Sequence, residues 1–187
     1  LSSMALVPTQ AKAKNARIIS RSLIRDTLSH IGGTSTVIFL IAMLADSEQR
    51  YLSLGLLYQI LRDSTLNSRE MEESYGYELG ARLMRKNRWV VDDKILSILF
   101  RVVGFERDPK HLTFSVGVLA NLSAFKYLIM DWRIWKRATT SVQKQLFESL
   151  AMIVNPLSEF CVFNIQRFRA AGVSEMLYWS LRSDEHG

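Results

Sequence analysis

Apolar residues recur at helical spacing along most of the chain, and no stretch alternates strictly enough to predict a strand. We therefore predict an all-α fold. The pattern predicts helices near residues 12–30, 35–46, 48–63, 68–74, 77–87, 92–104, 122–131, 140–154, 157–171 and 173–183.

Residues suited to helix ends separate these segments. Gly32 and Gly33 can take left-handed conformations at a helix end, and Asn155-Pro156 separates two helices. Ser47, Asn67 and Asp92 each precede a predicted helix and are predicted N-caps, and Glu70 adds a partial capping box to Asn67.

A weak internal repeat is the most informative feature of the pattern. Four times, a turn residue precedes a short apolar helix, at Gly33, Gly76, Asn121 and Gly172, so the intervals are 43, 45 and 51 residues. Armadillo and HEAT units contain about 40–47 residues, so the third interval needs an insertion. The repeat predicts an α-α superhelix, an armadillo/HEAT-like solenoid, in which each unit buries its apolar surface against its neighbours. A non-repetitive helical bundle is the alternative.

The longest apolar run, Val37–Ala45, is far shorter than the roughly 20 residues that a membrane-spanning helix needs. It also begins too late for the apolar core of a signal peptide. Because the run has no polar face, we expect a helix that is buried on nearly all sides. Residues 105–118 contain Asp108-Pro109 and Gly117 and are predicted to form a longer loop, either functional or a mobile connection between repeats.

Most of the net charge lies near the N-terminus. The chain of 187 residues has a formal net charge of +6, and the first thirty residues hold five cations against one acid, Asp26. On a helix, Lys14, Arg17, Arg21 and Arg25 would line one side, and Ala16, Ile19, Leu23 and Ile31 would fall largely on the other. This stripe could contact acidic lipid head groups, nucleic acid or an acidic protein, or it could be a solvated helix face.

Residue types that carry chemistry are scarce. The chain has one cysteine, Cys161, and three histidines in separate contexts. We therefore expect no internal disulfide and no metal site built from His and Cys. Cys161 lies in an apolar stretch and is predicted to be a small buried side chain. Adjacent acids, as in Glu72-Glu73, point in different directions on a helix and cannot share a proton. We therefore expect that this chain has no enzymatic activity and binds no cofactor.

Two clusters combine aromatic and basic residues and are the candidate interaction sites. The first consists of Trp132, Arg133, Trp135, Lys136 and Arg137, and the second of Arg82, Arg85, Lys86 and Arg88, followed by Trp89. Interleaved cations and indole rings could stack on bases or contact an acidic partner. Alternatively, the tryptophans belong to the core and the cations complement helix C-termini.

Several segments, in order, resemble the neurobeachin family of BEACH-domain proteins. The run REMEESYGYEL at residues 69–79 and the run KILSILFRVVG at residues 94–104 are similar to that family's "REME…HGY" and "NILKLAF…VG" stretches. The run SAFKYLIMDWRIW at residues 123–135 is similar to "aFqdLlcDfevW", and QLFE at residues 145–148 fits the same alignment. The resemblance extends over about residues 33–182.

The resemblance implies an armadillo-like region upstream of a BEACH domain, in proteins that act as scaffolds in vesicle trafficking and membrane-protein sorting. The family offers no catalytic residues to transfer. We expect residues 1–11 to be a flexible N-terminus or a remnant of cloning, and residues 12–187 to be one helical domain of a larger protein. The expected partners are trafficking factors or neighbouring domains, in the cytoplasm and peripherally at membranes.

The alternative function is a basic helical module that contacts an anionic membrane surface or nucleic acid. We do not expect nucleic acid as a partner, because no recognition motif accompanies the charge. A third hypothesis is a spacer that holds other domains apart.

Overall fold

The computed structural model describes residues 32–62, 64–105 and 117–183, and every regular element in these ranges is a helix. Residues 1–11 and the predicted helix at residues 12–30, with Lys14, Arg17, Arg21 and Arg25, lie outside the described residues. Most of the predicted loop at residues 105–118 lies outside them as well.

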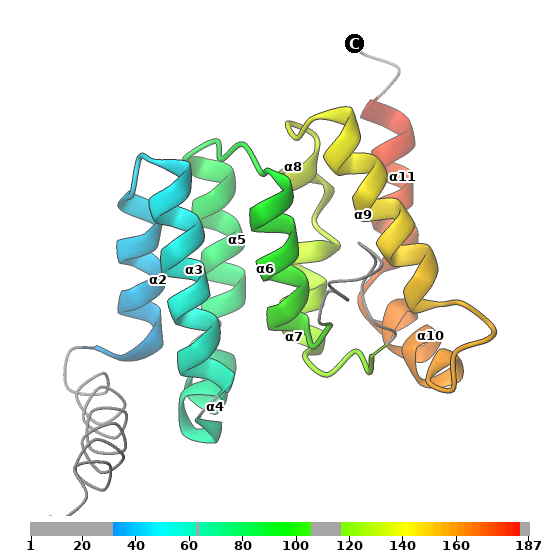
Figure 1. Cartoon of the computed structure of the whole chain (residues 1–187), viewed down its shortest axis with the longest axis horizontal. Coiled ribbons are helices and arrows are strands. Elements are labelled where there is room, and N and C mark those ends of the chain that lie inside the picture. Colours follow the sequence, from blue (N-terminus) through cyan, green and yellow to red (C-terminus); the bar gives the residue numbers. More distant parts are fainter. Residues whose placement is uncertain (1–31, 63, 106–116, 184–187) are drawn as a thin grey trace, which may run out of the picture.

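The helices follow one another from α2 at one end of the molecule to α11 at the other (Figure 1). Their bounds are α2 Gly33–Met43, α3 Ser47–Arg62, α4 Thr65–Glu73, α5 Gly76–Lys86, α6 Asp93–Val103, α7 Leu122–Ala124, the π-helix η1 Phe125–Ile129, α8 Trp132–Trp135, α9 Thr140–Ile153, α10 Cys161–Ala170 and α11 Val173–Ser183.

The helices form two rows that run along the molecule. In one row, α2 packs against α5, and α5 packs against η1; in the other, α3 packs against α6, and α6 packs against α9. Helices α3, α6 and α9 begin at Ser47, Asp93 and Thr140, at intervals of 46 and 47 residues. This regular stacking confirms the predicted all-α superhelix.

Polar contacts between successive units also follow the repeat. Four side-chain hydrogen bonds between units each join two residues that are 44 to 46 positions apart in the sequence. The donors and acceptors are Ser47 Oγ to Asp92 Oδ2 at 3.0 Å, Lys94 Nζ to Glu48 Oε2 at 2.8 Å, Asn87 Nδ2 to the Ala42 carbonyl at 2.6 Å and Asn121 Nδ2 to Tyr77 Oη at 2.6 Å. A solenoid produces such contacts because equivalent positions of neighbouring units face each other.

One of the three predicted N-caps is confirmed. Asp92 accepts a hydrogen bond from the Ile95 amide at 2.9 Å and caps α6. The prediction for Asn67 is wrong, because Ser64 caps α4 and leaves Asn67 buried in the first turn. The cap before α3 is Asp46, not Ser47, since Asp46 Oδ2 accepts from the Gln49 amide at 2.8 Å.

Two predicted helices differ most from the observed ones. The predicted helix 122–131 changes to π geometry at Phe125, where the Met130 amide donates to the Phe125 carbonyl at 2.9 Å. Asp131 then caps a separate helix, α8. The predicted helix 157–171 begins only at Cys161. Asn155 and Ser158 hold the preceding turns, because their side chains accept hydrogen bonds from the amides of Leu157 and Phe160.

The expectation that the Val37–Ala45 run is buried on nearly all sides is wrong. Ile38 and Ile41 are in the core, but Phe39 and Leu40 are 51% and 58% exposed. Helices α3, α4 and α5 pack against α2, and no other described element covers its remaining face. None of the described helices is both long enough and apolar enough to cross a bilayer.

Candidate functional site

An open groove of about 1020 Å³ lies between the η1–α8 segment and α11, with α5 at its edge. It is formed where the third and fourth units meet. Charged side chains predominate in its lining, which includes Glu78, Arg85, Lys126, Asp131, Arg133, Lys136, Glu175 and Arg182, together with the large side chains Tyr127, Met130, Trp132, Met176 and Trp179.

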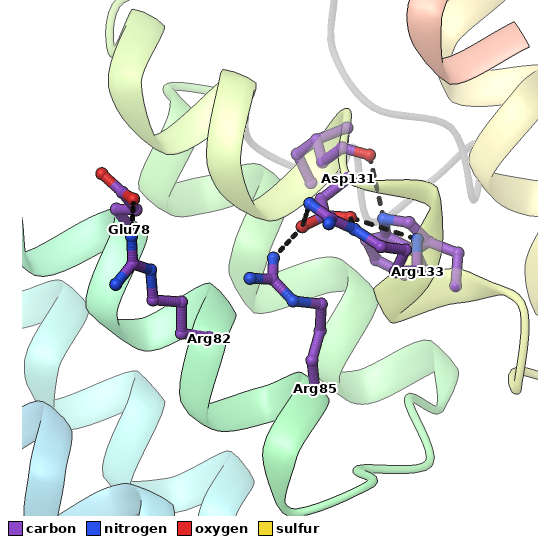
Figure 2. A network of polar contacts seen from close by, with 7 residues as sticks. Glu78, Arg82, Arg85, Asp131 and Arg133 are labelled. Atoms are coloured by element: carbon purple, nitrogen blue, oxygen red, sulfur yellow. Dashed lines mark hydrogen bonds and ion pairs between the residues drawn. The ribbon is translucent and has the colours of Figure 1, made fainter. Parts of the chain in front are cut away.

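Asp131 organises the charged wall of this groove (Figure 2). It is the N-cap of α8, where Oδ1 accepts from the Arg133 amide at 3.2 Å and from Arg133 Nε at 2.8 Å. Oδ2 accepts from Arg133 Nη2 at 3.0 Å and from Arg85 Nη1 of α5. A single carboxylate, 9% exposed, therefore holds two guanidinium groups and ties α8 to α5.

The hydrogen bond to Asp131 raises the pKa of Arg133. Partial burial opposes this shift, and the charges of Asp131 and Glu175 add to it. Because an arginine is protonated at any physiological pH, the consequence is a permanent positive charge at the groove wall.

Other cations at the groove differ in whether an acid neutralises them. Arg82, beside the groove on α5, forms an ion pair with Glu78 at 2.7 Å. Within the described part of the chain, no acidic side chain pairs with Lys126, Lys136 or Arg182. These three lie on η1, after α8 and on α11, so they surround the groove from both sides.

Apolar side chains lie between these charges. Met130 and Met176 are buried at the base of the groove, while Trp179 on α11 is 50% exposed. The groove therefore combines a charged rim with an adaptable apolar base, which suits a contact surface.

The fold brings together parts of the two basic clusters that the sequence suggested. Arg85 from one cluster and Arg133 and Lys136 from the other line the same groove, although 46 residues separate Arg85 from Asp131, the residue that joins them. Lys86, Arg88 and Arg137 are exposed but lie outside the groove lining.

The tryptophans of the two clusters are buried. Trp135 is fully buried and donates from Nε1 to the Ile129 carbonyl at 2.9 Å, and the Trp132 ring packs 5.7 Å from that of Phe147. Trp89 is buried too, with the Arg50 guanidinium 4.7 Å from its ring centre. The alternative interpretation, core tryptophans, is thus confirmed, and stacking of bases on these rings is not supported.

Several groove residues were not found from the sequence. Glu175, Trp179 and Arg182 on α11 are four and three positions apart and share one face of that helix. That spacing is the sequence pattern from which these three groove residues could have been predicted. It was not decisive because nothing in the sequence places this face opposite Lys126 and Lys136.

The described residues contain no group of three or more His, Cys, Asp or Glu side chains that could hold a metal ion. Cys161 is half-buried rather than fully buried, and its thiol donates to the Val154 carbonyl at 3.4 Å.

The chain is similar to segments of several very large proteins. It is 22% identical to WD repeat- and FYVE domain-containing protein 4 of Mus musculus over 138 residues, which are 74% of this chain and 4% of that protein. It is 23% identical to Beige protein homolog 1 of Schizosaccharomyces pombe over 163 residues, 86% of this chain and 6% of that protein. It is 22% identical to the human Lysosomal-trafficking regulator over 172 residues, 86% of this chain and 4% of that protein.

No protein-family model matches the chain, and no solved structure matches it either. The chain spans only 4% to 6% of the length of the three relatives named above. These relatives are BEACH-domain proteins, so the predicted resemblance to that family is confirmed, at about 22% identity over most of the chain.

Proposed function

We propose that this chain is a non-catalytic helical scaffold segment that binds other proteins within a BEACH-type trafficking protein. The observation that carries the proposal is the open groove between η1–α8 and α11, with its cationic rim and its exposed Trp179. Helical-repeat arrays present extended surfaces of this kind to partners, because each unit contacts only its neighbours and leaves whole faces exposed.

The kind of process is suggested by the relatives. One of them is named a lysosomal-trafficking regulator, and it is similar to this chain over 86% of the chain. We therefore expect the partners to be trafficking factors or neighbouring domains of the same protein, in the cytoplasm and peripherally at membranes.

The experiment uses the whole 187-residue chain as bait in a cell lysate, with an unrelated helical-repeat protein of similar net charge as the control. We expect the chain to retrieve trafficking proteins that the control does not. These proteins should be lost when exposed residues along one face are replaced and circular dichroism shows that the fold is retained. Equal retrieval by the control protein would contradict the proposal.

Contact with an anionic membrane surface is the second candidate. It is favoured by Lys86, Arg88 and Arg137, which are exposed and form none of the ion pairs found among the described residues. Such binding should weaken steeply with salt. Co-sedimentation with vesicles that contain phosphatidylserine, measured at low and high salt, tests it, and absence of co-sedimentation at low salt would exclude it.

A further inference from the structure

We infer that the groove between η1–α8 and α11 binds an acidic peptide segment that carries a large apolar side chain. The inference rests on the proposed function, since it names the chemistry of the partner and the surface that receives it. Three features of the groove carry it: its balance of charge, its apolar base and its concave shape.

The balance of charge at the groove is positive. Its lining contains the cations Arg85, Lys126, Arg133, Lys136 and Arg182 and the acids Glu78, Asp131 and Glu175. Two of these acids are already engaged, because Asp131 binds both Arg85 and Arg133, and Glu78 binds Arg82.

The groove cations that have no acidic partner among the described residues stand on opposite sides of the groove. Lys126 and Lys136 flank the η1–α8 side, and Arg182 lies on α11, where its guanidinium contacts the Tyr178 hydroxyl. A peptide lying between the two sides can therefore place carboxylates against each of them. Complementary charge of this kind steers association and selects partners.

The base of the groove can receive an apolar side chain. Met130 and Met176 are buried there, and the Trp179 ring stands half-exposed beside them. Methionine side chains adapt to irregular ligands, and a tryptophan in a partly enclosed site is a frequent anchor of binding energy. An acidic peptide without an apolar residue would leave the half-exposed Trp179 ring in contact with water.

The shape favours a peptide over a membrane or a nucleic acid. A bilayer surface cannot enter a groove bounded by helices on two sides, so it would meet only the outermost cations. Single-stranded nucleic acid needs a series of exposed aromatic rings, whereas of the two tryptophans in the groove lining Trp132 is buried and Trp179 is half-exposed.

Helix α11 has two outward faces, and only one of them lines the groove. Gly172, Glu175, Met176, Trp179 and Arg182 line the groove, whereas the exposed residues Leu177, Tyr178 and Leu181 are absent from its lining. A packing partner for the second face would therefore leave the groove accessible.

Fluorescence anisotropy with a labelled synthetic peptide tests the inference. The probe is a 12-residue peptide in which Asp and Glu flank a central Phe-Leu pair, and the comparison peptide has Lys in place of every acid. We expect binding of the acidic peptide by the whole chain and a loss of affinity of at least about tenfold in the triple variant Lys126→Glu, Lys136→Glu, Arg182→Glu. Trp179→Ala should weaken binding by about tenfold without changing the net charge.

A second triple variant, Lys86→Glu, Arg88→Glu, Arg137→Glu, is the matched control. It has the same change in net charge at exposed residues outside the groove lining. Thermal unfolding establishes that both variants are folded. Equal weakening by the two variants, or no binding of the acidic peptide by the unmodified chain at about 1 mM, overturns the inference.

The remaining outcomes separate this inference from the proposed function. If the groove variant still retrieves the same trafficking proteins from lysate, the scaffold function stands and the groove is not its site. If the acidic peptide binds as expected but the bait retrieves no trafficking protein, the groove stands and the scaffold function fails. If phosphatidylserine vesicles or RNA bind in place of the peptide, and the groove variant abolishes that binding, the assignment to a peptide is overturned.

Discussion

The α2–α5 interface and the groove between η1–α8 and α11 belong to the same row of helices, but they are built differently. Between α2 and α5 the helices approach closely at Gly80, where an added Cβ would lie 3.6 Å from Ile38 Cγ2. Only a small void of about 40 Å³ remains there, and its lining is almost wholly apolar. At the other end of the row, the charged groove is about 1020 Å³.

The difference shows how side-chain chemistry sets the spacing of a solenoid. Apolar and small side chains at facing positions let two helices close, because their burial is favourable and needs no partner. Charged side chains at facing positions keep the helices apart, because burying them costs more than their mutual attraction returns unless each is fully hydrogen-bonded. The closed interface therefore stabilises the array, and the open one stays accessible from outside.

Truncation of a side chain at the small void beside the α2–α5 interface should have the largest effect. Leu99 in α6 is 1% exposed and lines the small apolar void. Leu99→Ala should lower the free energy of unfolding by about 2–5 kcal/mol, because it removes buried methyl groups and enlarges the void. Urea denaturation measures the change. Lys136→Ala, at the open groove, is the control and should alter stability by less than about 0.5 kcal/mol. Similar values for both variants would remove the distinction between the two regions.

The next largest effect should come from the carboxylate that closes the edge of the groove. Asp131→Ala removes the N-cap of α8 and leaves Arg85, 26% exposed, without its partner. We expect a loss of about 1–3 kcal/mol. Glu78→Ala is the matched control, because Glu78 binds the well-exposed Arg82 and should cost less than about 1 kcal/mol. If Asp131→Ala leaves the urea midpoint unchanged, the network is not a structural link between α5 and α8.

The free energy of unfolding should depend on pH through Tyr77, which lines the small void beside the α2–α5 interface. Burial raises the pKa of Tyr77 to about 12, and the hydrogen bond from Asn121 only partly opposes this shift. Below pH 10 the phenol is protonated in both states, so its contribution to stability is fully present. Between pH 10 and 12 the unfolded chain loses this proton and the folded chain keeps it. Stability should therefore fall by about 1.4 kcal/mol per pH unit from this group.

Tyr77→Phe checks the assignment of that slope. The variant should lose about 1 kcal/mol at neutral pH, because Asn121 Nδ2 loses its acceptor, and it should show a shallower decline in stability above pH 10. Urea denaturation at a series of alkaline pH values gives both quantities. An unchanged alkaline slope in the variant would mean that Tyr77 ionises as readily in the folded chain as in the unfolded one.

The smallest predicted effect is a gain in stability. At Gly80 an added methyl group would make ordinary contacts, 3.6 Å from Ile38 and 4.0 Å from Leu128. Gly80→Ala should therefore stabilise the protein by about 0.5–1 kcal/mol, mainly through helix propensity. Gly55→Ala in α3 has the propensity gain without new contacts, since nothing lies within 4 Å of its added Cβ. A loss of stability in Gly80→Ala but not in Gly55→Ala would show that the closed interface has no room for a methyl group.

The sequence predicted much of the helical array because helix periodicity and the repeat are local properties. Gly33, Gly76, Asn121 and Gly172 were identified as the starts of four equivalent helices, and a helix begins at or directly after each of them. Asn121 begins a helix without the conformational freedom of glycine, because its Oδ1 caps α7 by accepting from the Ala124 amide at 2.8 Å. Its Nδ2 also donates to Tyr77 Oη of the preceding unit. The N-caps of α3 and α4 were misplaced because several polar residues stand near each helix start, and backbone geometry decides which of them turns back.

The groove was only partly predictable. Arg85, Arg133 and Lys136 stand out in the sequence as basic residues close to tryptophans, but their neighbours across the groove, Glu175, Trp179 and Arg182, come from the last described helix. The pairing of Arg85 with Asp131 depends on stacking of one unit on the next, which no local pattern specifies.

The sequence by itself determined the all-helical class, the repeat and the relation to BEACH-domain proteins, since each depends on residue types at short spacing. The tertiary structure decided which tryptophans are core, which arginines share one carboxylate and where the row of helices stays open. Those outcomes depend on contacts between units about 45 residues apart in the sequence, and a charge or a ring acquires its role only from what stacking places opposite it.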